Sequence, residues 1–231
     1  MTSHINEFGQ AIGFPLDFTG PWPRPQGITF TGRTCYLKRA APEHARELFD
    51  CYSLDTSGKN WTYMPTSPAR AFAEFEAWFL STCLGDDFLF YTVFDRDARA
   101  IGIACYLRIN PSVGSTEVGW ISMSPLMQRT VMSTEAMYLM MRHVFDDLSY
   151  RRYEWKCDSL NAQSRVTAQR LGFQFEGIFR NCTHYKGRNR DTAWFAIIDS
   201  DWPALEARFT AYLDPTNFDA QDQQIRRLLD F

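Results

Sequence analysis

Two stretches of the sequence place polar side chains at the start of a predicted helix that follows a predicted strand. The first is the run 128–134, which comes after a strand that begins at Glu117. The second begins at Asn161, with Ser164 three residues later, after the strand 153–157. The first N–H groups of a helix have no acceptor within the helix and carry partial positive charge. The run 128–134 is therefore a candidate site for a phosphate group, although most strand–turn–helix units only form core.

The spacing of apolar residues predicts the elements around the first stretch. In the strand that begins at Glu117, alternate side chains are expected to face opposite sides of a sheet. One side would carry Glu117, Gly119, Ile121 and Met123, and the other Val118, Trp120 and Ser122. Ser133 and Thr134 are residue types that cap a helix start, and apolar residues then recur at helical spacing up to residue 148.

The remaining elements predict one α/β domain. Further strands are expected at residues 34–39, 88–94, 100–109, 173–185 and 192–198, and further helices at 42–52, 69–84, 161–171 and 200–212. Short connections make the strands from residue 88 to the strand at Glu117 antiparallel neighbours. A helix joins the strand at Glu117 to the strand 153–157, so these two should be parallel. Ligands of such sheets bind beyond the carboxyl ends of the strands, where both helix starts lie.

Composition argues against several classes of function. The formal net charge of −3 on 231 residues gives no global support for binding nucleic acid or an anionic membrane. No apolar run approaches the roughly 20 residues of a membrane helix, and the N-terminus has no stretch of the signal-peptide type. Six cysteines without a Cys-x-x-Cys pair indicate reduced thiols in a cytoplasmic protein. The four histidines lack ligand-like spacing, so no metal site is expected.

The two ends of the chain are expected to differ from the domain between them. Residues 1–32 are rich in Pro and Gly and favour an extended strap on the domain surface, with a lid over a binding site as the alternative. The expected anchors of this strap are Phe14, Phe18 and Trp22. Residues 33–213 form the domain, and the polar tail 214–231 is expected to be loosely held.

Two loops could border a ligand. The aromatic cluster of Trp61 and Tyr63, together with Tyr106, is a candidate wall of a substrate pocket, and packing of the cluster into the core is the alternative. The basic run 186–190 is expected to be a solvated hairpin turn. The alternative is that this run contacts a phosphate or an acidic substrate.

The two helix starts also carry a longer pattern. It consists of Glu117-Val-Gly, then Gln128 to Thr134-Glu-Ala, then Asn161-x-x-Ser164 and Leu171-Gly172-Phe173-x-x-Glu176-Gly. This pattern resembles the GCN5-related N-acetyltransferases (GNAT), and within them the ribosomal-protein-alanine acetyltransferase-like branch, over residues 33–203. The resemblance implies a mixed, mostly antiparallel sheet with a central splayed parallel strand pair, and acetyl-CoA as the acetyl donor.

The resemblance also implies where acetyl-CoA binds. In the family, pantetheine lies between the splayed strands, here beside Ile121, Ser122 and Met123. The pyrophosphate site would be formed by Gln128, Arg129, Thr130, Val131, Met132, Ser133 and Thr134, with Asn161 and Ser164 also near CoA. The family has Gly where this chain has Val131, and Gly is frequent where it has Arg129. Because a β-branched residue avoids positive φ, we expect an altered loop geometry at Val131, and Arg129 could add charge toward a phosphate.

Acetyl transfer to an amine needs a base for the amine proton and an acid for the leaving thiolate. The resemblance implies Glu117 as the base, directly or through water, and Ser164 as the acid. A structural carboxylate and a helix-capping hydroxyl are the alternatives for these two residues. Attack should be direct in a ternary complex, since a cysteine on a strand, such as Cys157, is usually inert packing.

The expected function is therefore an N-acetyltransferase acting on a protein N-terminus or a small-molecule amine. The alternative is a non-catalytic module with the same fold that binds acyl-CoA or a partner. The reason for this alternative is that Val131 stands where the family has glycine. The expected partners include no nucleic acid and no membrane. Oligomeric state is open, with a homodimer as one option.

Overall fold

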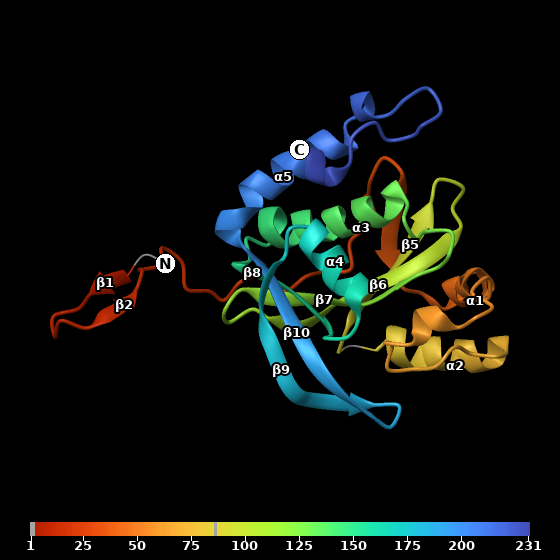
Figure 1. Ribbon diagram of the computed structural model, residues 1–231, viewed down its shortest axis with the longest axis horizontal. Helices are drawn as coiled ribbons and strands as arrows, with labels where there is room; N and C mark the ends of the chain where they lie inside the picture. The colour runs from red at the N-terminus through yellow and green to blue at the C-terminus, as the bar shows by residue number, and fades with distance from the viewer. Residues whose placement is uncertain (1–2, 86) are drawn as a thin grey trace.

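An eight-stranded sheet forms the centre of the computed structural model, which describes residues 3–85 and 87–231 (Figure 1). Its order is β3-β4-β5-β6-β7-β8-β10-β9. The strands are Phe30–Thr31 (β3), Cys35–Arg39 (β4), Leu89–Asp95 (β5), Ala100–Asn110 (β6), Ser115–Met123 (β7), Arg152–Asp158 (β8), Gln174–Tyr185 (β9) and Arg188–Ile198 (β10). Neighbours are antiparallel except β7 and β8, which are parallel. The predicted mixed, mostly antiparallel α/β fold with a central parallel pair is confirmed.

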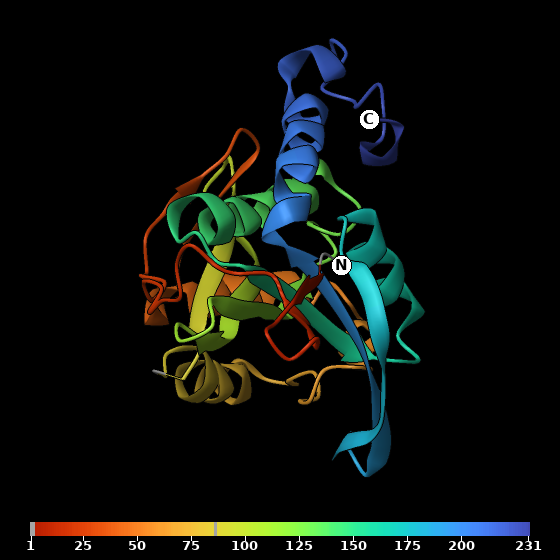
Figure 2. The same cartoon turned by 90° about the vertical axis from the view of Figure 1, so that its left-hand side faces the viewer.

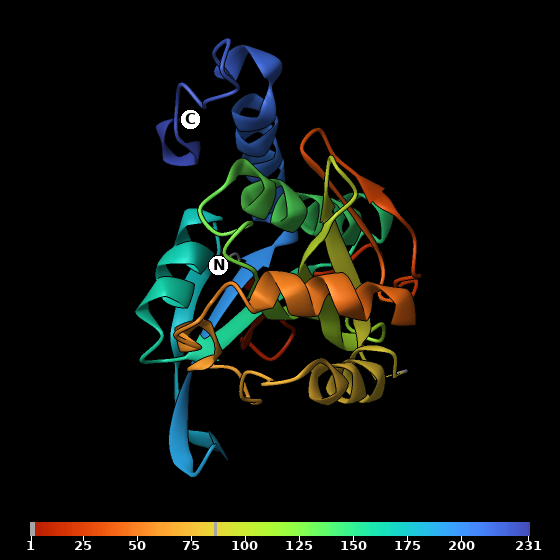
Figure 3. The ribbon, with the colours of Figure 1, turned by 90° about the vertical axis from the view of Figure 1, so that its right-hand side faces the viewer.

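Helices cover both faces of this sheet. The α-helices are Ala45–Tyr52 (α1), Phe72–Cys83 (α2), Val131–Arg142 (α3), Ala162–Arg170 (α4) and Trp202–Leu213 (α5), and α3 continues into a π-helical turn, His143–Asp147. Short 3-10 turns lie at Pro42–His44, Lys59–Trp61, Asp199–Asp201, Pro215–Asn217 and Leu228–Asp230. Figures 2 and 3 show α3 and α5 on one side of the sheet and α2 on the other. No helix of the described residues is both long and apolar enough to cross a membrane.

The central strand β6 explains why two cores form. Tyr106 packs into the core under α3, while Cys105 and Leu107 pack into the core under α1 and α2. A strand that is covered on both faces needs apolar residues at successive positions rather than at alternate ones. The run of buried residues 100–107 meets that need.

The parallel strands β7 and β8 separate part-way along their length. Their pairing covers only Ser115 to Val118 of β7. Just beyond, Trp120 has a φ of +49°, and the register of β7 against β6 shifts. This bulge turns Trp120 toward Trp78 and Phe90, whereas Val118 packs in the core under α3. The prediction that Val118 and Trp120 share one face is therefore wrong, because a bulge breaks strict alternation.

The N-terminal extension packs on the domain over only part of its length. Strands β1 (Ser3–Ile5) and β2 (Ala11–Gly13) form a separate hairpin that projects from the body (Figure 1). Trp22 is buried, and its Nε1 donates to the carbonyl oxygen of Ser149 at 2.8 Å. Phe18 and Phe14 are both 55% exposed, and of the two, Phe18 packs edge-on against Trp22.

The C-terminal segment 214–231 is mostly exposed, but a few contacts attach it to the domain. Leu228 is buried, and Asn217 Nδ2 donates to the carbonyl oxygens of Tyr212 and Arg226. Arg33 forms an ion pair with Asp222 at 3.1 Å. The polar composition of this segment hid these contacts, because most of them are made to its own backbone or to residues distant in sequence.

Candidate active site

The edge of β7 opens where β8 diverges from it. In the described part of the chain, residues 119–123 pair only with β6. Tyr52 Oη donates to the Ser122 carbonyl at 2.9 Å, and Gln128 Nε2 donates to the Met123 carbonyl at 2.8 Å. These bonds hold the open edge in place where Ile121, Ser122 and Met123 were expected to meet pantetheine. An extended, amide-bearing ligand could pair with such an edge.

Helix α3 begins earlier than the sequence predicted. Its N-cap is Thr130, whose Oγ1 accepts from the Ser133 amide at 3.4 Å. Ser133 and Thr134 lie inside the first turn and are buried, so they do not cap the helix. The amides of Val131 and Met132 meet no acceptor among the residues that the structure describes. The first turn of α3 therefore keeps free donors for an anion.

The loop before α3 explains why Val131 is tolerated. Val131 is the first helical residue, a conformation that any L-residue adopts, and its φ is not positive. The positive φ of +60° falls instead on Arg129. The departure from the family pattern that matters for backbone conformation is thus at Arg129, where glycine would be less strained.

The start of α4 places Ser164 beside β8. Asn161 caps the helix, since its Oδ1 accepts from the Ser164 amide at 3.1 Å. Ser164 Oγ accepts from Nε1 of Trp155, on β8, at 2.9 Å. Because a hydroxyl that accepts from an indole still carries its own proton, Ser164 can donate that proton to another group.

Cys157 is poorly suited to form an acyl-enzyme. It is buried, and burial raises the pKa of its thiol above the ordinary value, although a hydrogen bond with Ser164 works in the opposite direction. Since the thiolate is the nucleophilic form of cysteine, a raised pKa keeps this side chain unreactive.

Glu117 lies in a buried ion network. Its side chain is only 5% exposed, and Oε2 lies 3.0 Å from Lys156 Nζ and 2.5 Å from an Arg108 guanidinium nitrogen. Lys156 Nζ also lies 2.7 Å from Glu154 Oε2 and 3.6 Å from the centre of the Trp194 ring.

Lys156 escaped the sequence analysis. Glu117 and Glu154 are register partners on neighbouring strands. Two carboxylates placed opposite each other repel, so they need a cation between them. The available signal was the charged pair Glu154 and Lys156 on one face of the strand 153–157, and it could be interpreted only once the β7–β8 register was known.

The predicted acceptor residues do not lie together. Trp61 is buried and packs edge-on against Tyr52 and Trp78, so the core alternative holds for it. Tyr106 is instead a core residue, because it is fully buried and its Oη donates to the Met140 carbonyl at 2.7 Å. Tyr63 remains partly exposed and donates to the Leu160 carbonyl at 3.1 Å. Among the described contacts of these three side chains, the one that reaches the β8–α4 connection is that of Tyr63 with the Leu160 carbonyl.

The basic run 186–190 lies at a hairpin turn, as predicted, and its residues 186–189 are exposed, but two of its side chains also bind a neighbouring loop. The turn comprises Lys186 and Gly187, and β10 begins at Arg188. Lys186 Nζ donates to the Trp61 carbonyl at 2.6 Å, and Arg188 donates to the Thr62 carbonyl at 2.9 Å. The run therefore ties the β9–β10 hairpin to the loop that carries Tyr63.

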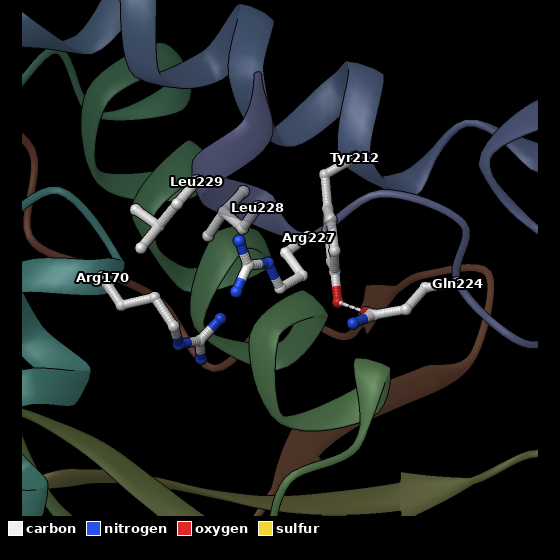
Figure 4. A pocket seen from close by; sticks show the side chains of 6 residues that line it. All are labelled: Arg170, Tyr212, Gln224, Arg227, Leu228 and Leu229. Atoms are coloured by element: carbon white, nitrogen blue, oxygen red, sulfur yellow. Dashed lines mark hydrogen bonds between the residues drawn. The ribbon is translucent and has the colours of Figure 1, made fainter.

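A cavity of about 290 Å³ lies beside the first turn of α3 (Figure 4). Its lining comes from α4, α5 and the C-terminal segment: Arg170, Tyr212, Gln224, Arg227, Leu228 and Leu229. Arg170 donates to Thr134 Oγ1 at 3.1 Å, and burial lowers the pKa of its guanidinium. Arg227 pairs with Asp230 at 3.2 Å, so Arg170 is the guanidinium of this cavity that contacts the first turn of α3. Among the described residues, no group of His, Cys, Asp or Glu side chains could hold a metal ion.

Comparisons with known proteins place this chain in a family. Residues 35–174 match the model of the acetyltransferase (GNAT) domain. A GCN5-related N-acetyltransferase from Brucella melitensis is 42% identical, with a TM-score of 0.89 over 93% of this chain and 97% of the other. A GNAT-family protein from Chromobacterium violaceum, described as a probable acetyltransferase, is 32% identical, with a TM-score of 0.78 over 84% and 98%.

More distant structures share the fold alone. A candidate ribosomal-protein-serine acetyltransferase from Vibrio cholerae is 20% identical, with a TM-score of 0.64 over 74% of this chain and 97% of the other. No curated protein matches the chain.

Proposed function

Because this chain belongs to the GNAT family of acetyltransferases, we propose that it is an N-acetyltransferase that moves the acetyl group of acetyl-CoA to a primary amine. The observation that carries the proposal is the open edge of β7 at residues 119–123, next to free amides at the start of α3. An extended pantetheine chain and a pyrophosphate are the two groups that these features fit.

The residues at the cleft fit acetyl-CoA. Pantetheine amides would pair along Ile121, Ser122 and Met123, and the amides of Val131 and Met132 would meet the pyrophosphate. Arg129 precedes the same helix start and would add a positive charge. The remaining residues of the run, Gln128, Thr130, Ser133 and Thr134, would hold the strand end and the first helical turn in shape. Acetyl-CoA supplies the activated thioester.

Two side chains would move protons. Glu117 Oε1 meets no donor among the described residues, so this oxygen can accept the amine proton. Ser164 would give its hydroxyl proton to the departing CoA sulfur, while Asn161 holds the helix start from which Ser164 projects. Attack by the amine would be direct, since burial keeps Cys157 protonated.

The acceptor is a primary amine on a protein N-terminus or on a small molecule. Support for the protein acceptor is the resemblance to the ribosomal-protein-alanine acetyltransferase-like branch, together with the shared fold of the Vibrio cholerae protein. Tyr63 would lie at the acceptor side, because its loop touches the β8–α4 connection. We also propose a cytoplasmic location, which the six free cysteines support.

The reason for the alternative of a non-catalytic binding module no longer applies. It rested on Val131 replacing a loop glycine, and Val131 begins α3 with ordinary helical geometry. The test of the proposed function is the release of CoA thiol from acetyl-CoA in the presence of N-terminal peptides and small amines. Amine-dependent thiol release supports the proposal, whereas tight acetyl-CoA binding without turnover across both panels would contradict it.

Replacing Val131 and Arg129 by glycine in separate variants should have opposite effects on stability. Val131→Gly should destabilise the protein by roughly 0.5–1 kcal/mol, because glycine weakens a helix. Arg129→Gly should stabilise it by up to about 1 kcal/mol, because it removes a left-handed non-glycine residue. Denaturant unfolding measures both changes.

The same two variants test the assignment of the phosphate site. Arg129→Gly should weaken acetyl-CoA binding several-fold through the lost charge, and Val131→Gly should not improve it. Calorimetric titration gives the two affinities. Tighter binding by Val131→Gly would show that Val131 obstructs the cofactor after all.

A further inference from the structure

A chain of alternating charges crosses the sheet beside the proposed base. Its members are Arg108, Glu117, Lys156, Glu154, Arg152 and Glu176, in order of contact. Contacts between successive members span 2.5 to 3.0 Å. The chain starts at Arg108 on β6, passes through β7 and β8, and ends at Glu176 on β9, at the outer edge of the sheet. Its three positive and three negative groups balance.

Lys156 is the buried link of this chain. Its side chain is 4% exposed, and its ammonium lies between Glu117 and Glu154 and over the Trp194 ring. A buried ammonium is costly unless partners surround it, and here two carboxylates and an aromatic ring do so. Burial opposes the charged form of Glu154, but Lys156 and Arg152 outweigh it and hold the pKa of the Glu154 carboxyl below its ordinary value. Lys156 therefore keeps a charged partner whatever the state of Glu117.

The two carboxylate oxygens of Glu117 have different surroundings. Both cations, Lys156 and Arg108, bind Oε2. Oε1 lies 3.4 Å from the point where a Cβ at Gly119 would stand. Gly119 is the first residue of β7 beyond the paired segment that ends at Val118. The free oxygen is thus turned toward the place where the two strands part.

We propose that Lys156 is a positioning residue that fixes Oε2 of Glu117 and so presents Oε1 to the acceptor amine. The inference rests on the proposed role of Glu117 as base. In the step, an N–H bond of the protonated acceptor, an ammonium group, breaks and an O–H bond forms at Oε1. The electron pair of the broken bond becomes the lone pair of the neutral amine, which can then attack the thioester carbonyl. When Glu117 becomes neutral in this way, Lys156 remains paired with Glu154.

Several groups face the Glu117 carboxylate. Arg108 and the thiol of Cys105 come from β6, and Lys156 comes from β8. Burial raises the pKa of Cys105 far above its ordinary value, so this thiol stays neutral. Arg108 is 60% exposed, which leaves Lys156 as the buried cation at the base. Removing Lys156 should therefore loosen Oε2 of Glu117 more than removing Arg108 would.

The test is Lys156→Met, assayed as thiol release across pH. We expect kcat to fall by about 10²-fold, as misplacement of a catalytic group can cause. The acidic limb of the kcat profile should move to higher pH, because loss of a cation favours the uncharged acid. Binding of acetyl-CoA should be unchanged by calorimetry. In a Glu117→Gln background, Lys156→Met should cause no further loss of kcat.

The matched control is Arg152→Met, which removes a cation from the same charge chain that does not touch Glu117. It should leave the acidic limb of the profile in place. Lys156→Arg keeps the charge and serves if Lys156→Met does not fold. The acidic limb of the kcat profile of Lys156→Arg should stay near the wild-type position. Its kcat should fall, because the longer side chain displaces Oε2 of Glu117.

Two results would overturn the role of Lys156. One is that every folded Lys156 variant keeps the wild-type kcat and the wild-type position of the acidic limb of the kcat profile. The other is an equal loss of kcat with and without Glu117, which would show a purely structural effect. Absence of amine-dependent turnover in the wild-type protein would instead refute the proposed function itself, so the two failures can be told apart.

Discussion

Glu117→Gln is expected to lower kcat by about 10²- to 10⁴-fold, the usual contribution of a general base. Glutamine keeps the size of the side chain but cannot accept a proton at Oε1. Acetyl-CoA binding should persist, because the proposed CoA contacts come from the β7 edge and the start of α3. The measurement is kcat for thiol release with saturating amine, together with calorimetric titration of acetyl-CoA.

The control for this variant is Glu176→Gln. Glu176 is the far end of the same charge chain and contacts Arg152 rather than the cleft. It should retain the wild-type kcat. If Glu117→Gln instead turned over at the wild-type rate while folded, Glu117 would be a structural carboxylate, and the base would have to be sought elsewhere at the cleft.

Glu135→Gln is expected to lower the free energy of unfolding by about 3–5 kcal/mol. Glu135, on α3, is 3% exposed and accepts from the amides of Arg33 and Thr34 at 2.6 Å each and of Cys35 at 3.2 Å. The Thr34 hydroxyl also donates to it. A glutamine would turn an NH₂ donor toward these donors and leave some of them buried without an acceptor.

Denaturant unfolding with an unchanged m-value would measure this loss. Asp50→Asn is the matched control, because Asp50 is exposed and its ion pair with Arg46 is long at 3.9 Å. Its effect should stay within about 0.5 kcal/mol. Equal stabilities of the two variants would mean that Glu135 does not tie the start of β4 to α3.

Local signals predicted the frame of the site well. The sequence placed a helix start at Asn161, and the Asn161 side chain caps that helix. The helix between residues 117 and 153 required a crossover, which gave the parallel pair. Such features depend on neighbours in the sequence or on connection lengths, so they can be predicted without knowledge of tertiary contacts.

Other features depended on competition between equivalent local choices. Thr130, Ser133 and Thr134 are all capping types, and packing buries the last two within the first turn of α3. The bulge at Trp120 shifts the alternation of β7, and assigning faces by strict alternation missed its effect on Trp120. In both cases the tertiary contacts select one of several local solutions.

The residues that meet across strands were the hardest to predict. The contact between Lys156 and Glu117 exists only because β7 and β8 pair in one register. Tyr106 was predicted to border a substrate pocket, yet its ring packs in the core under α3, where it is fully buried. A single sequence carries the pattern of each strand but not the register between strands.

A crystal structure of the protein with CoA would test most directly whether the opening between β7 and β8 is the cofactor site. We expect pantetheine along residues 119–123, the pyrophosphate against the amides of Val131 and Met132, and the CoA sulfur between Ser164 and Glu117. CoA bound elsewhere, or β7 and β8 paired along their full length with CoA absent at saturating concentration, would contradict this expectation.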